Sequence, residues 1–407
     1  MEPKRIVIIG AGFGGLTAAL TLARHSLARH AYQILLIDKN PYHLYTPALY
    51  EIAALPQEEK PASTLKTVVT IPLDTICARH HGLTFLQDAL VGIKERESCV
   101  ILRDTGTIKY DYMVLAFGSQ TNYFNIPGLT QYTCSFKNFT DAIRIRNKIA
   151  SVYAAQSSIK VIICGGGASG VELAAECANY LTTLASHQNS RYTHQIILVE
   201  AAQKILPGFH EKLRIRTEKR LKKLGVILKT GSTVKRADTR TLFLNDETQI
   251  PFDICIWTGG IQGQDPVEKL NIKLSAKKTL FVNMYLEITP RLYAIGDIAE
   301  VRHPRTNQIL PASVPVAEAE AKSVAYNIIA SVQGNPQRPF MPWQQYPFIL
   351  ALGKKYALAD LVVCRISGSP AWILKLLVEF RYFLFLLPLP RALMLWYKNI
   401  RAYAAND

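Results

Sequence analysis

The sequence predicts an α/β protein with two doubly wound domains, followed by a C-terminal segment of short apolar helices. The first observation is the length, because 407 residues are more than one hydrophobic core usually organises. The second is a unit of buried strand, glycine loop and helix that occurs twice, at 4–24 and again at 159–181. The third is the stretch 371–407, which is rich in apolar and aromatic residues but interrupted by charges and prolines.

The first of these units has the sequence of a site for a dinucleotide pyrophosphate. A continuous apolar run over Lys4–Ile9 predicts a central parallel strand, and the glycines of GAGFGG follow it directly. In this context Gly10 provides a tight turn, Gly12 a close approach of the backbone, and Gly15 close helix–strand packing. The helix that begins there presents free amides to phosphate. The next strand ends in Asp38, an acid placed to accept hydrogen bonds from an adenosine ribose.

The second unit repeats the same order of elements. The strand IKVIIC runs into Gly165, Gly167 and Gly170 at the same spacing, a helix follows, and the next strand ends in Glu200. An acid at that point favours an unphosphorylated ribose, and no arginine adjoins it, so we expect NADH rather than NADPH. Two adenine dinucleotides in one chain suggest a resident FAD and a visiting nicotinamide cofactor that passes hydride to it.

Two further segments are predicted to cross between the domains. They are the strand-and-loop segments 112–128 and 291–300, and the second places Asp297 near a helix N-terminus. The predicted bounds are 1–125 with 286–345 for a discontinuous FAD-binding domain, 126–285 for the inserted NADH-binding domain, and 346–407 for the C-terminal segment.

The C-terminal stretch indicates a protein that lies on a membrane surface. A spanning helix needs about 20 apolar residues, whereas the longest uncharged run here is the nine-residue stretch Tyr382–Pro390, which contains prolines. Between Arg365 and Asp407 the chain has six Lys or Arg and two acids. Short apolar helices with aromatic residues and spaced cations suit the interface of an anionic bilayer. A dimerisation surface or a pair of core-packing helices would give a similar pattern, and both interpretations stay open.

The composition agrees with an acidic partner. Lys and Arg number 47 against 31 Asp and Glu, a formal charge of +16. Nucleic acid and an anionic lipid leaflet both fit such a charge, but no DNA- or RNA-binding module is recognisable, so we expect no nucleic-acid partner. The seven cysteines are scattered without metal-ligand spacing, which indicates reduced, mostly structural thiols and no metal site. No signal peptide is recognisable ahead of Ile6, and we expect folding in the cytoplasm.

Taken together, these motifs resemble the pyridine nucleotide–disulfide oxidoreductase superfamily, and within it the type II, non-pumping NADH dehydrogenases. The resemblance covers nearly the whole chain and rests on IVIIGAGFGGL, YHLYTPALYEIA, GSQTNYFNIPG, GGGASGVELAAE, IWTGGI and LYAIGDIAE. It implies a flavoprotein of the respiratory chain that passes hydride from NADH to FAD and two electrons to a membrane quinone, without pumping protons. It also implies a peripheral enzyme on the cytoplasmic face of a membrane. A homodimer is one oligomeric state that the resemblance allows.

The resemblance assigns residues to individual sites. Those implied in FAD binding are Gly10, Gly12, Gly14, Gly15, Asp38, Lys39, Thr46, Gly118 and Asp297. Those implied in NADH binding are Gly165, Gly167, Gly170, Glu200, Gly259 and Gly260. Glu172 would be the catalytic residue, which positions groups or handles protons near the nicotinamide–flavin junction. An acid in the first turn of a helix also fits a simple interaction with the helix dipole.

The expected quinone site departs from the family pattern. Many type II dehydrogenases carry a helix of the form APVAxQQ, and the corresponding stretch here is SVPVAEAEAKS. Pro315 matches, but Ala319 and Glu320 replace the two glutamines, and an ionised carboxylate can only accept hydrogen bonds. We expect these three residues at the quinone site, while solvation of a helix start would explain Glu318 and Glu320 equally well.

Two other functions remain as alternatives. A sulfide:quinone oxidoreductase shares much of this pattern but needs placed cysteines, and neither Cys134 nor Cys164 can be identified with one from its spacing. A membrane-docked flavoprotein that senses NADH is the alternative from another class.

Overall fold

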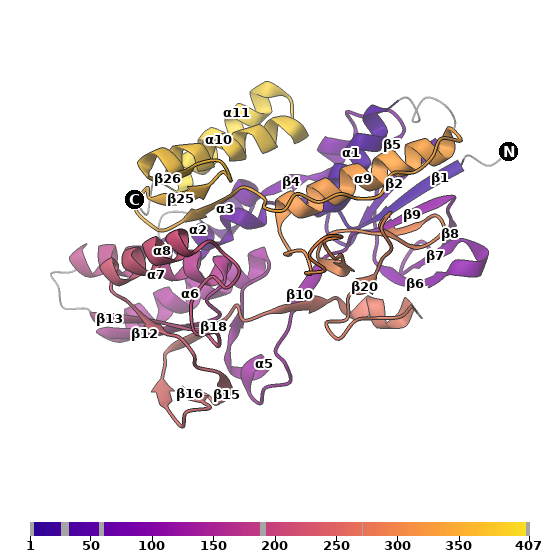
Figure 1. Cartoon of the computed structure of the whole chain (residues 1–407). Helices are drawn as coiled ribbons and strands as arrows, with labels where there is room; N and C mark the ends of the chain where they lie inside the picture. Colours follow the sequence, from indigo (N-terminus) through magenta and orange to yellow (C-terminus); the bar gives the residue numbers. More distant parts are fainter. Residues whose placement is uncertain (1–3, 26–31, 57–60, 188–192, 271, 404–407) are drawn as a thin grey trace. The chain divides into compact units, whose positions relative to one another are not determined.

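The computed structural model describes residues 4–25, 32–56, 61–187, 193–270 and 272–403, and the chain divides into two compact units (Figure 1). Unit 1 consists of Met1–Leu44, Ile71–Gln120 and Ile261–Tyr346. Unit 2 consists of Tyr45–Thr70, Thr121–Gly260 and Pro347–Asp407. Each unit contains one of the two predicted parallel sheets with its glycine loop.

Unit 1 is built on a six-stranded sheet in the order β21-β22-β9-β1-β2-β5. Its strands are β1 (Lys4–Ile9), β2 (Tyr32–Asp38), β5 (Leu83–Gln87), β9 (Tyr112–Leu115), β21 (Glu287–Thr289) and β22 (Leu292–Ala294). All pair in parallel except β21 with β22. The strand order reverses at β1, which has β2 on one side and β9 on the other, and a ligand-binding loop is expected to follow such a strand.

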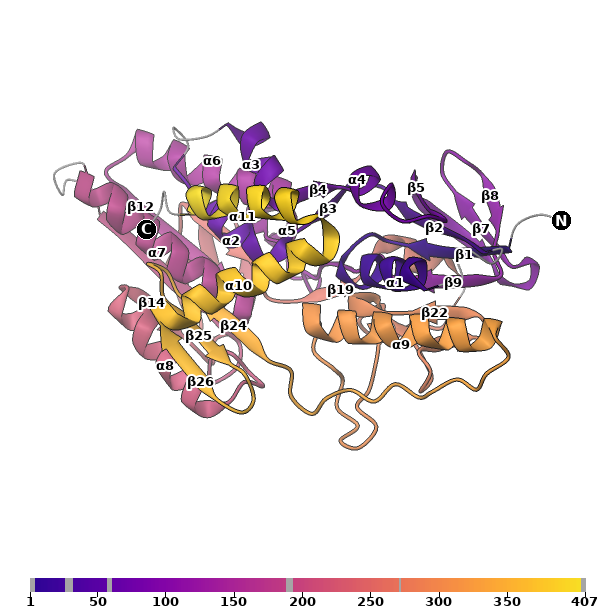
Figure 2. The same cartoon turned by 90° about the horizontal axis from the view of Figure 1, so that it is seen from above.

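Two helices of unit 1 lie side by side in both views, α1 (Phe13–Arg24) and α9 (Val314–Val332) (Figures 1 and 2). Gly14 belongs to this contact region, because a Cβ there would lie 3.6 Å from the carbonyl oxygen of Ala317. The other elements of unit 1 include α4 (Leu73–Cys77) and an antiparallel sheet of β6 (Leu90–Lys94), β7 (Cys99–Leu102) and β8 (Thr107–Lys109).

Unit 2 is built on a five-stranded parallel sheet in the order β11-β18-β12-β13-β14. Its strands are β11 (Cys134–Ser135), β12 (Ser158–Cys164), β13 (Thr193–Val199), β14 (Val226–Lys229) and β18 (Ile254–Trp257). Strand β12 has β13 on one side and β18 on the other, so the second glycine loop also follows the strand at which the order reverses.

The helices of unit 2 are α2 (Leu49–Ala53), α3 (Ala62–Val69), α5 (Leu129–Tyr132), α6 (Phe139–Ala155), α7 (Ala168–His187), α8 (Glu211–Lys223), α10 (Ser369–Leu386) and α11 (Leu389–Tyr403). Its antiparallel strands are β15 (Val234–Ala237), β16 (Thr241–Leu244), β17 (Gln249–Pro251), β24 (Phe348–Ala351), β25 (Ala357–Asp360) and β26 (Arg365–Gly368). Short strands elsewhere in the chain are β3 (Tyr42–Leu44), β4 (Thr70–Pro72), β10 (Ser119–Thr121), β19 (Ile261–Gly263), β20 (Leu280–Phe281) and β23 (Ala299–Glu300).

Residues 261–285, predicted in the NADH-binding domain, belong to unit 1, and the units differ from the predicted domains in two further places. Residues 45–70, predicted in the FAD-binding domain, belong to unit 2 because α2 packs against α6 and α7. The C-terminal segment, predicted as a separate part, also belongs to unit 2, because β24 contacts α7 and β25 contacts α8. Both differences come from packing between segments that are far apart in the sequence.

Helices α10 and α11 confirm the predicted pair of short apolar helices, which pack against each other (Figure 2). The break falls at Leu387 and Pro388, inside the proline-containing stretch. Large apolar side chains that stay exposed on this pair are Ile373, Leu377, Val378, Leu384, Leu389, Leu393, Met394 and Tyr397. In the described ranges, none of the helices is both long enough and apolar enough to cross a bilayer.

Candidate functional site

The two glycine loops have the same backbone geometry. Gly10 has φ +102° and Gly165 has φ +118°, a region that glycine enters readily and other residues rarely do. A Cβ on Gly15 would lie 1.8 Å from the carbonyl oxygen of Gly10, and one on Gly170 would lie 1.9 Å from that of Gly165. These four positions therefore require glycine for the fold of the loop itself, as the sequence predicted.

The middle glycine of each loop differs from its neighbours, because it borders open space. A Cβ on Gly12 or on Gly167 would meet no atom within 4 Å. Both residues stand immediately before a helix, α1 or α7, whose first amides have no intrahelical partner. Open space beside free amides and the positive end of a helix dipole fits a phosphate group. Each loop thus fits the pyrophosphate of a dinucleotide.

The acids at the two strand ends hold the loops in place. The amide of Ala11 donates to Asp38 Oδ2 at 2.7 Å, and the amide of Gly166 donates to Glu200 Oε2 at 2.5 Å. The second carboxylate oxygen of each acid accepts the amide two residues further along the chain. Burial raises the pKa of Asp38 above its ordinary value. The role of both acids toward a ribose stays a prediction, and their role in ordering the loops is added by the structure.

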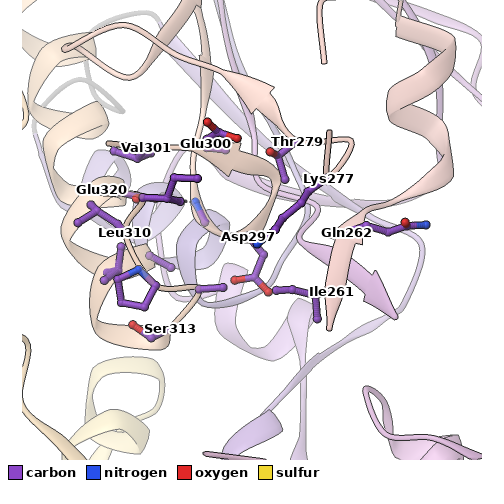
Figure 3. A pocket seen from close by; sticks show the side chains of 17 residues that line it. Ile261, Gln262, Lys277, Thr279, Asp297, Glu300, Val301, Leu310, Ser313 and Glu320 are labelled. Atoms are coloured by element: carbon purple, nitrogen blue, oxygen red, sulfur yellow. Dashed lines mark hydrogen bonds between the residues drawn. The ribbon is translucent and has the colours of Figure 1, made fainter. Parts of the chain in front are cut away.

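A cavity of about 290 Å³ lies in unit 1 beside the predicted FAD residue Asp297 (Figure 3). Asp297 belongs to a 3₁₀ turn, Gly296–Ile298, and its Oδ2 accepts a hydrogen bond of 2.7 Å from Ser119 Oγ. Lys277 and Glu320 line the same cavity. Gly118, next to Ser119, has φ +72°. The charged side chains of Lys277, Asp297 and Glu320 therefore line one space.

Glu320 is buried in this cavity wall, with 2% of its surface exposed. Its Oε2 accepts a hydrogen bond of 2.6 Å from the amide of Gly296. Desolvation, together with the nearby Asp297 carboxylate, raises the pKa of Glu320 to about 8. The alternative of a solvated acid at a helix start is therefore wrong for Glu320. Pro315 and Ala319, predicted beside it, are half-buried and do not line the cavity.

Glu320→Gln is expected to change how stability depends on pH. The folded-state pKa of about 8 lies above the ordinary value of 4.5, so the folded chain binds the extra proton between these two values. The contribution of Glu320 to stability is therefore full below about pH 4.5 and is lost as the pH rises toward 8. The wild type should lose up to about 1.4 kcal/mol per pH unit relative to the variant in this window. Urea unfolding at a series of pH values measures the difference, and parallel pH profiles would contradict the prediction.

Glu172 lies in the first turns of α7 and contacts the C-terminal part of unit 2. The amide of Ala351 in β24 donates to Glu172 Oε1 at 3.2 Å. Desolvation raises the pKa of Glu172 to about 8, against the opposing effect of Lys375. Glu172 therefore holds a proton at neutral pH, which fits a proton-handling group better than a carboxylate that serves the helix dipole.

Lys375 of α10 is paired with an acid and only 15% of its side chain is exposed, contrary to the prediction of a cation that faces lipid headgroups. Its Nζ lies 2.7 Å from Glu51 Oε1 of α2 and 4.9 Å from the centre of the Tyr50 ring. Burial alone would lower the pKa of Lys375, but the carboxylates of Glu51 and Glu379 outweigh burial and raise it. The pairing across 324 residues left no local signal in the sequence.

Glu379, one helical turn after Lys375, extends this buried group of charges. The amide nitrogen of Asn399 in α11 donates to Glu379 Oε1 at 2.6 Å. Desolvation raises the pKa of Glu379 to about 7. The spacing of four residues between two charges on an apolar helix is the one sequence signal that could have indicated a shared buried face.

Lys375→Met is expected to destabilise unit 2 by about 3–5 kcal/mol, because it leaves the Glu51 carboxylate buried without its partner. Adding Glu51→Gln should recover part of that loss, since the uncompensated charge is then removed. Lys222→Met, the same change at an exposed position of α8, should shift the free energy of unfolding by less than about 0.5 kcal/mol. Urea unfolding tests all three, and a double variant no more stable than Lys375→Met would argue against a buried ion pair.

The remaining residues predicted to bind a cofactor differ in their packing, in their exposure and in the unit to which they belong. Gly259 and Gly260 follow β18, and a Cβ on either would lie 2.7 Å from an aromatic ring, so both positions require glycine for close packing. Lys39 is exposed, and its Nζ donates a hydrogen bond of 3.4 Å to Gln264 Oε1. Thr46 is exposed and belongs to unit 2, whereas the other residues predicted to bind FAD belong to unit 1.

Two side chains that support the loops were missed from the sequence. Thr258 Oγ1 donates to the carbonyl oxygens of Cys164 and Gly165, at 3.0 and 3.1 Å, and so ties β18 to the second loop. His43 is buried with Nδ1 at 2.8 Å from the carbonyl oxygen of Ala11 in the first loop. Desolvation lowers the pKa of His43 to about 4, so the ring is neutral at pH 7. Thr258 lies in IWTGGI and His43 in YHLYTPALYEIA, but neither motif by itself indicates that these side chains contact the loops.

The cysteines considered for thiol chemistry are buried. Cys134 is enclosed in β11, and Cys164 Sγ lies 3.8 Å from Cys255 Sγ in the neighbouring strand β18. Desolvation raises the pKa of Cys134, so that its thiol stays protonated. These positions agree with the structural role predicted for Cys164.

Comparisons with known proteins agree with this geometry. A family model described as pyridine nucleotide-disulphide oxidoreductase matches residues 4–321. The demethylphylloquinone reductase NdbB of Synechocystis sp. is 30% identical over 92% of this chain and 91% of its own length. A type II NADH:quinone oxidoreductase of Haemophilus influenzae is 25% identical over 83% of this chain and 82% of its own length.

Two solved structures share the fold over 98% of this chain. The structure of NDH2 from Plasmodium falciparum in complex with NADH has a TM-score of 0.83 at 18% identity, with 98% of that chain covered. The sulfide:quinone oxidoreductase of Aquifex aeolicus has a TM-score of 0.78 at 19% identity, with 92% of that chain covered. The fold by itself therefore does not separate NADH from sulfide as the electron donor.

Proposed function

The chain belongs to the pyridine nucleotide-disulphide oxidoreductase family, and on this premise we propose that it is a type II NADH:quinone oxidoreductase that does not pump protons. When bound, FAD would supply the redox chemistry, the acceptance of hydride from the nicotinamide and the transfer of two electrons to the quinone. The observation that carries the proposal is the duplicated phosphate cradle, at Gly12 and again at Gly167. A second nucleotide cradle is what an NADH-dependent flavoenzyme needs in addition to its FAD site.

The residues of unit 1 fit FAD and those of unit 2 fit NADH. In unit 1 the loop at Gly12, the acid Asp38 and the pair of Ser119 with Asp297 would hold the dinucleotide through its phosphates and hydroxyl groups. In unit 2 the loop at Gly167 would hold NADH in the same way. The protein chiefly binds and orients the two redox partners.

Two carboxyl groups with raised pKa values, the half-buried Glu172 and the buried Glu320, fit the handling of protons that quinone reduction consumes. Glu172 and Glu320 both hold a proton at neutral pH because burial raises their pKa values to about 8. A protonated carboxyl group can donate a hydrogen bond as a glutamine amide does. Glu320 can therefore take the donor role of the family's glutamine even though an ionised glutamate could not.

Steady-state oxidation of NADH with a panel of acceptors tests this function. Purified protein loaded with FAD should reduce a short-chain quinone, and NADPH should be a poorer donor than NADH because Glu200 repels a 2′-phosphate. Sulfide-driven quinone reduction at a higher rate than NADH-driven reduction would favour the sulfide:quinone alternative. Rapid reduction of the flavin without turnover would favour an NADH sensor.

The apolar faces of α10 and α11 support peripheral attachment to an anionic membrane, which we place on the cytoplasmic side. The exposed cations Arg381, Arg391 and Arg401 lie among the exposed apolar side chains of these helices. A homodimer that forms through the same helices would also be compatible with their apolar character. We expect no nucleic-acid partner.

Met394→Glu should weaken binding to anionic vesicles about tenfold, since Met394 is 71% exposed on α11 and the change sets a charge in the apolar face. Met284→Glu makes the same change at an exposed position of unit 1 and should leave binding unchanged. Sedimentation with vesicles measures both, and equal binding of both variants would contradict attachment through α11.

A further inference from the structure

The hairpin of β25 and β26 ends in four residues of unusual composition, Leu361–Cys364, which we call the hairpin tip. Val363 is 92% exposed, Val362 is 43% exposed, and Cys364 is exposed as well. Hairpin turns in water usually carry Gly, Asn, Asp or Ser, which suit both the backbone conformation and the solvent. Here the sequence places Leu, Val, Val and Cys at that point.

The backbone of the hairpin tip is strained but firmly held. Val362 has φ +72°, which is costly for a β-branched residue. Its amide donates to Asp360 Oδ1 at 3.0 Å, and Arg365 Nε donates to Asp360 Oδ2 at 2.9 Å. The amide of Leu361 also donates to the carbonyl oxygen of Cys364 at 2.9 Å. The fold therefore presents the two valines outward in one defined arrangement.

The exposed charges on the two helices that follow the hairpin tip are of one sign. The charged residues between Leu361 and Tyr403 are Arg365, Lys375, Glu379, Arg381, Arg391, Lys398 and Arg401. The single acid among them, Glu379, is 1% exposed and faces the interior. Helix α10 packs against β25 and β26, and its exposed apolar residues Ile373 and Leu377 belong to the same unit. Arg365 pairs with Asp360 and Lys375 pairs with Glu51, so the exposed charges of α10 and α11 are the cations Arg381, Arg391 and Arg401, which lie among apolar side chains.

We propose that the hairpin tip inserts Val362 and Val363 into the headgroup–acyl boundary of an anionic bilayer, as a second anchor beside α10 and α11. This inference rests on the membrane attachment proposed above. Anionic lipid complements the exposed cations of α10 and α11, whereas a symmetric pair of copies that met through these helices would bring like charges together. The bilayer is therefore the occupant that the charges favour over a second copy of the chain.

Cys364 allows a direct test, because it is exposed and the other six cysteines are buried. The full-length flavoprotein is labelled at Cys364 with an environment-sensitive fluorescent maleimide and mixed with vesicles of phosphatidylcholine, with or without phosphatidylglycerol. Binding is followed by sedimentation, and insertion by the emission of the label and its quenching by spin labels in the acyl chains. We expect both binding and at least about a twofold rise in emission with the anionic vesicles.

The outcomes separate the inference from the attachment on which it rests. Sedimentation without a change in emission or quenching would overturn insertion of the hairpin tip and leave attachment through α10 and α11 intact. No sedimentation with anionic vesicles would overturn both. Equal binding to vesicles with and without phosphatidylglycerol would contradict the role of the surface cations.

Variants provide a second, independent measurement. Val363→Asp should weaken binding to anionic vesicles about tenfold. Met284→Asp, the same change at a 61% exposed position of unit 1, should leave binding unchanged. Val362→Asn, whose side chain tolerates a positive φ, should weaken binding while the protein melts no earlier than the wild type. Unaltered binding of both hairpin-tip variants would overturn the inference.

Discussion

Gly12→Val is expected to give a folded but colourless protein. The side chain of valine would fill the open space that borders Gly12, where the first loop and the start of α1 fit a phosphate. The fold should survive, because a Cβ at this position meets no atom within 4 Å and the residue already has an extended conformation (φ −70°, ψ −170°). FAD binding should weaken at least about tenfold, measured as flavin per chain after purification and by titration with added FAD.

The contrast with Gly10 makes this prediction specific. Gly10→Val would place a Cβ 2.5 Å from a backbone oxygen, so that variant should lose the fold together with the flavin. Circular dichroism and thermal melting separate the two cases. A Gly12→Val protein with a full complement of flavin would show that the first loop does not hold the FAD phosphates.

Gly167→Val is expected to give a yellow protein that NADH reduces poorly. The substitution is the same as at Gly12, but it fills the cradle of unit 2 and leaves unit 1 unchanged. Flavin content should match the wild type, while the KM for NADH rises at least about tenfold. Chemical reduction by dithionite and reoxidation by quinone should proceed as in the wild type, because neither requires the second cradle.

The two valine variants act as controls for each other. If Gly167→Val lost its flavin while Gly12→Val kept it, the assignment of FAD to unit 1 and NADH to unit 2 would be reversed. If both variants lost flavin, the second cradle would hold no separate substrate, and the duplicated loop would have another purpose.

The features that depend on which residues follow one another in the chain could be predicted from the sequence. Strand, glycine spacing and helix stand next to one another in the chain, so the conformations required at Gly10, Gly15 and their counterparts could be predicted from spacing alone. The helix break at Pro388 was likewise local, because a proline inside a helix removes a backbone hydrogen bond and clashes with the preceding turn.

The features missed from the sequence depend on contacts between distant residues. Glu320 is buried and accepts a hydrogen bond from the amide of Gly296, whereas the sequence around it, AEAEAKS, shows small residues that alternate with acids. Lys375 was expected to face lipid because the apolar pattern of α10 does not reveal Glu51 in α2. In both cases a charged residue stands on an otherwise apolar or small-residue helix face. Such a position indicates that the charge has a partner inside the protein, but the sequence does not identify that partner.

Anaerobic mixing of the purified flavoprotein with NADH tests the central claim most directly, with the visible absorbance of the flavin as the signal. We predict that NADH bleaches this absorbance and that a short-chain quinone, added afterwards, restores it. A flavin that dithionite bleaches but NADH leaves oxidised would contradict the claim that this chain holds FAD and NADH as redox partners.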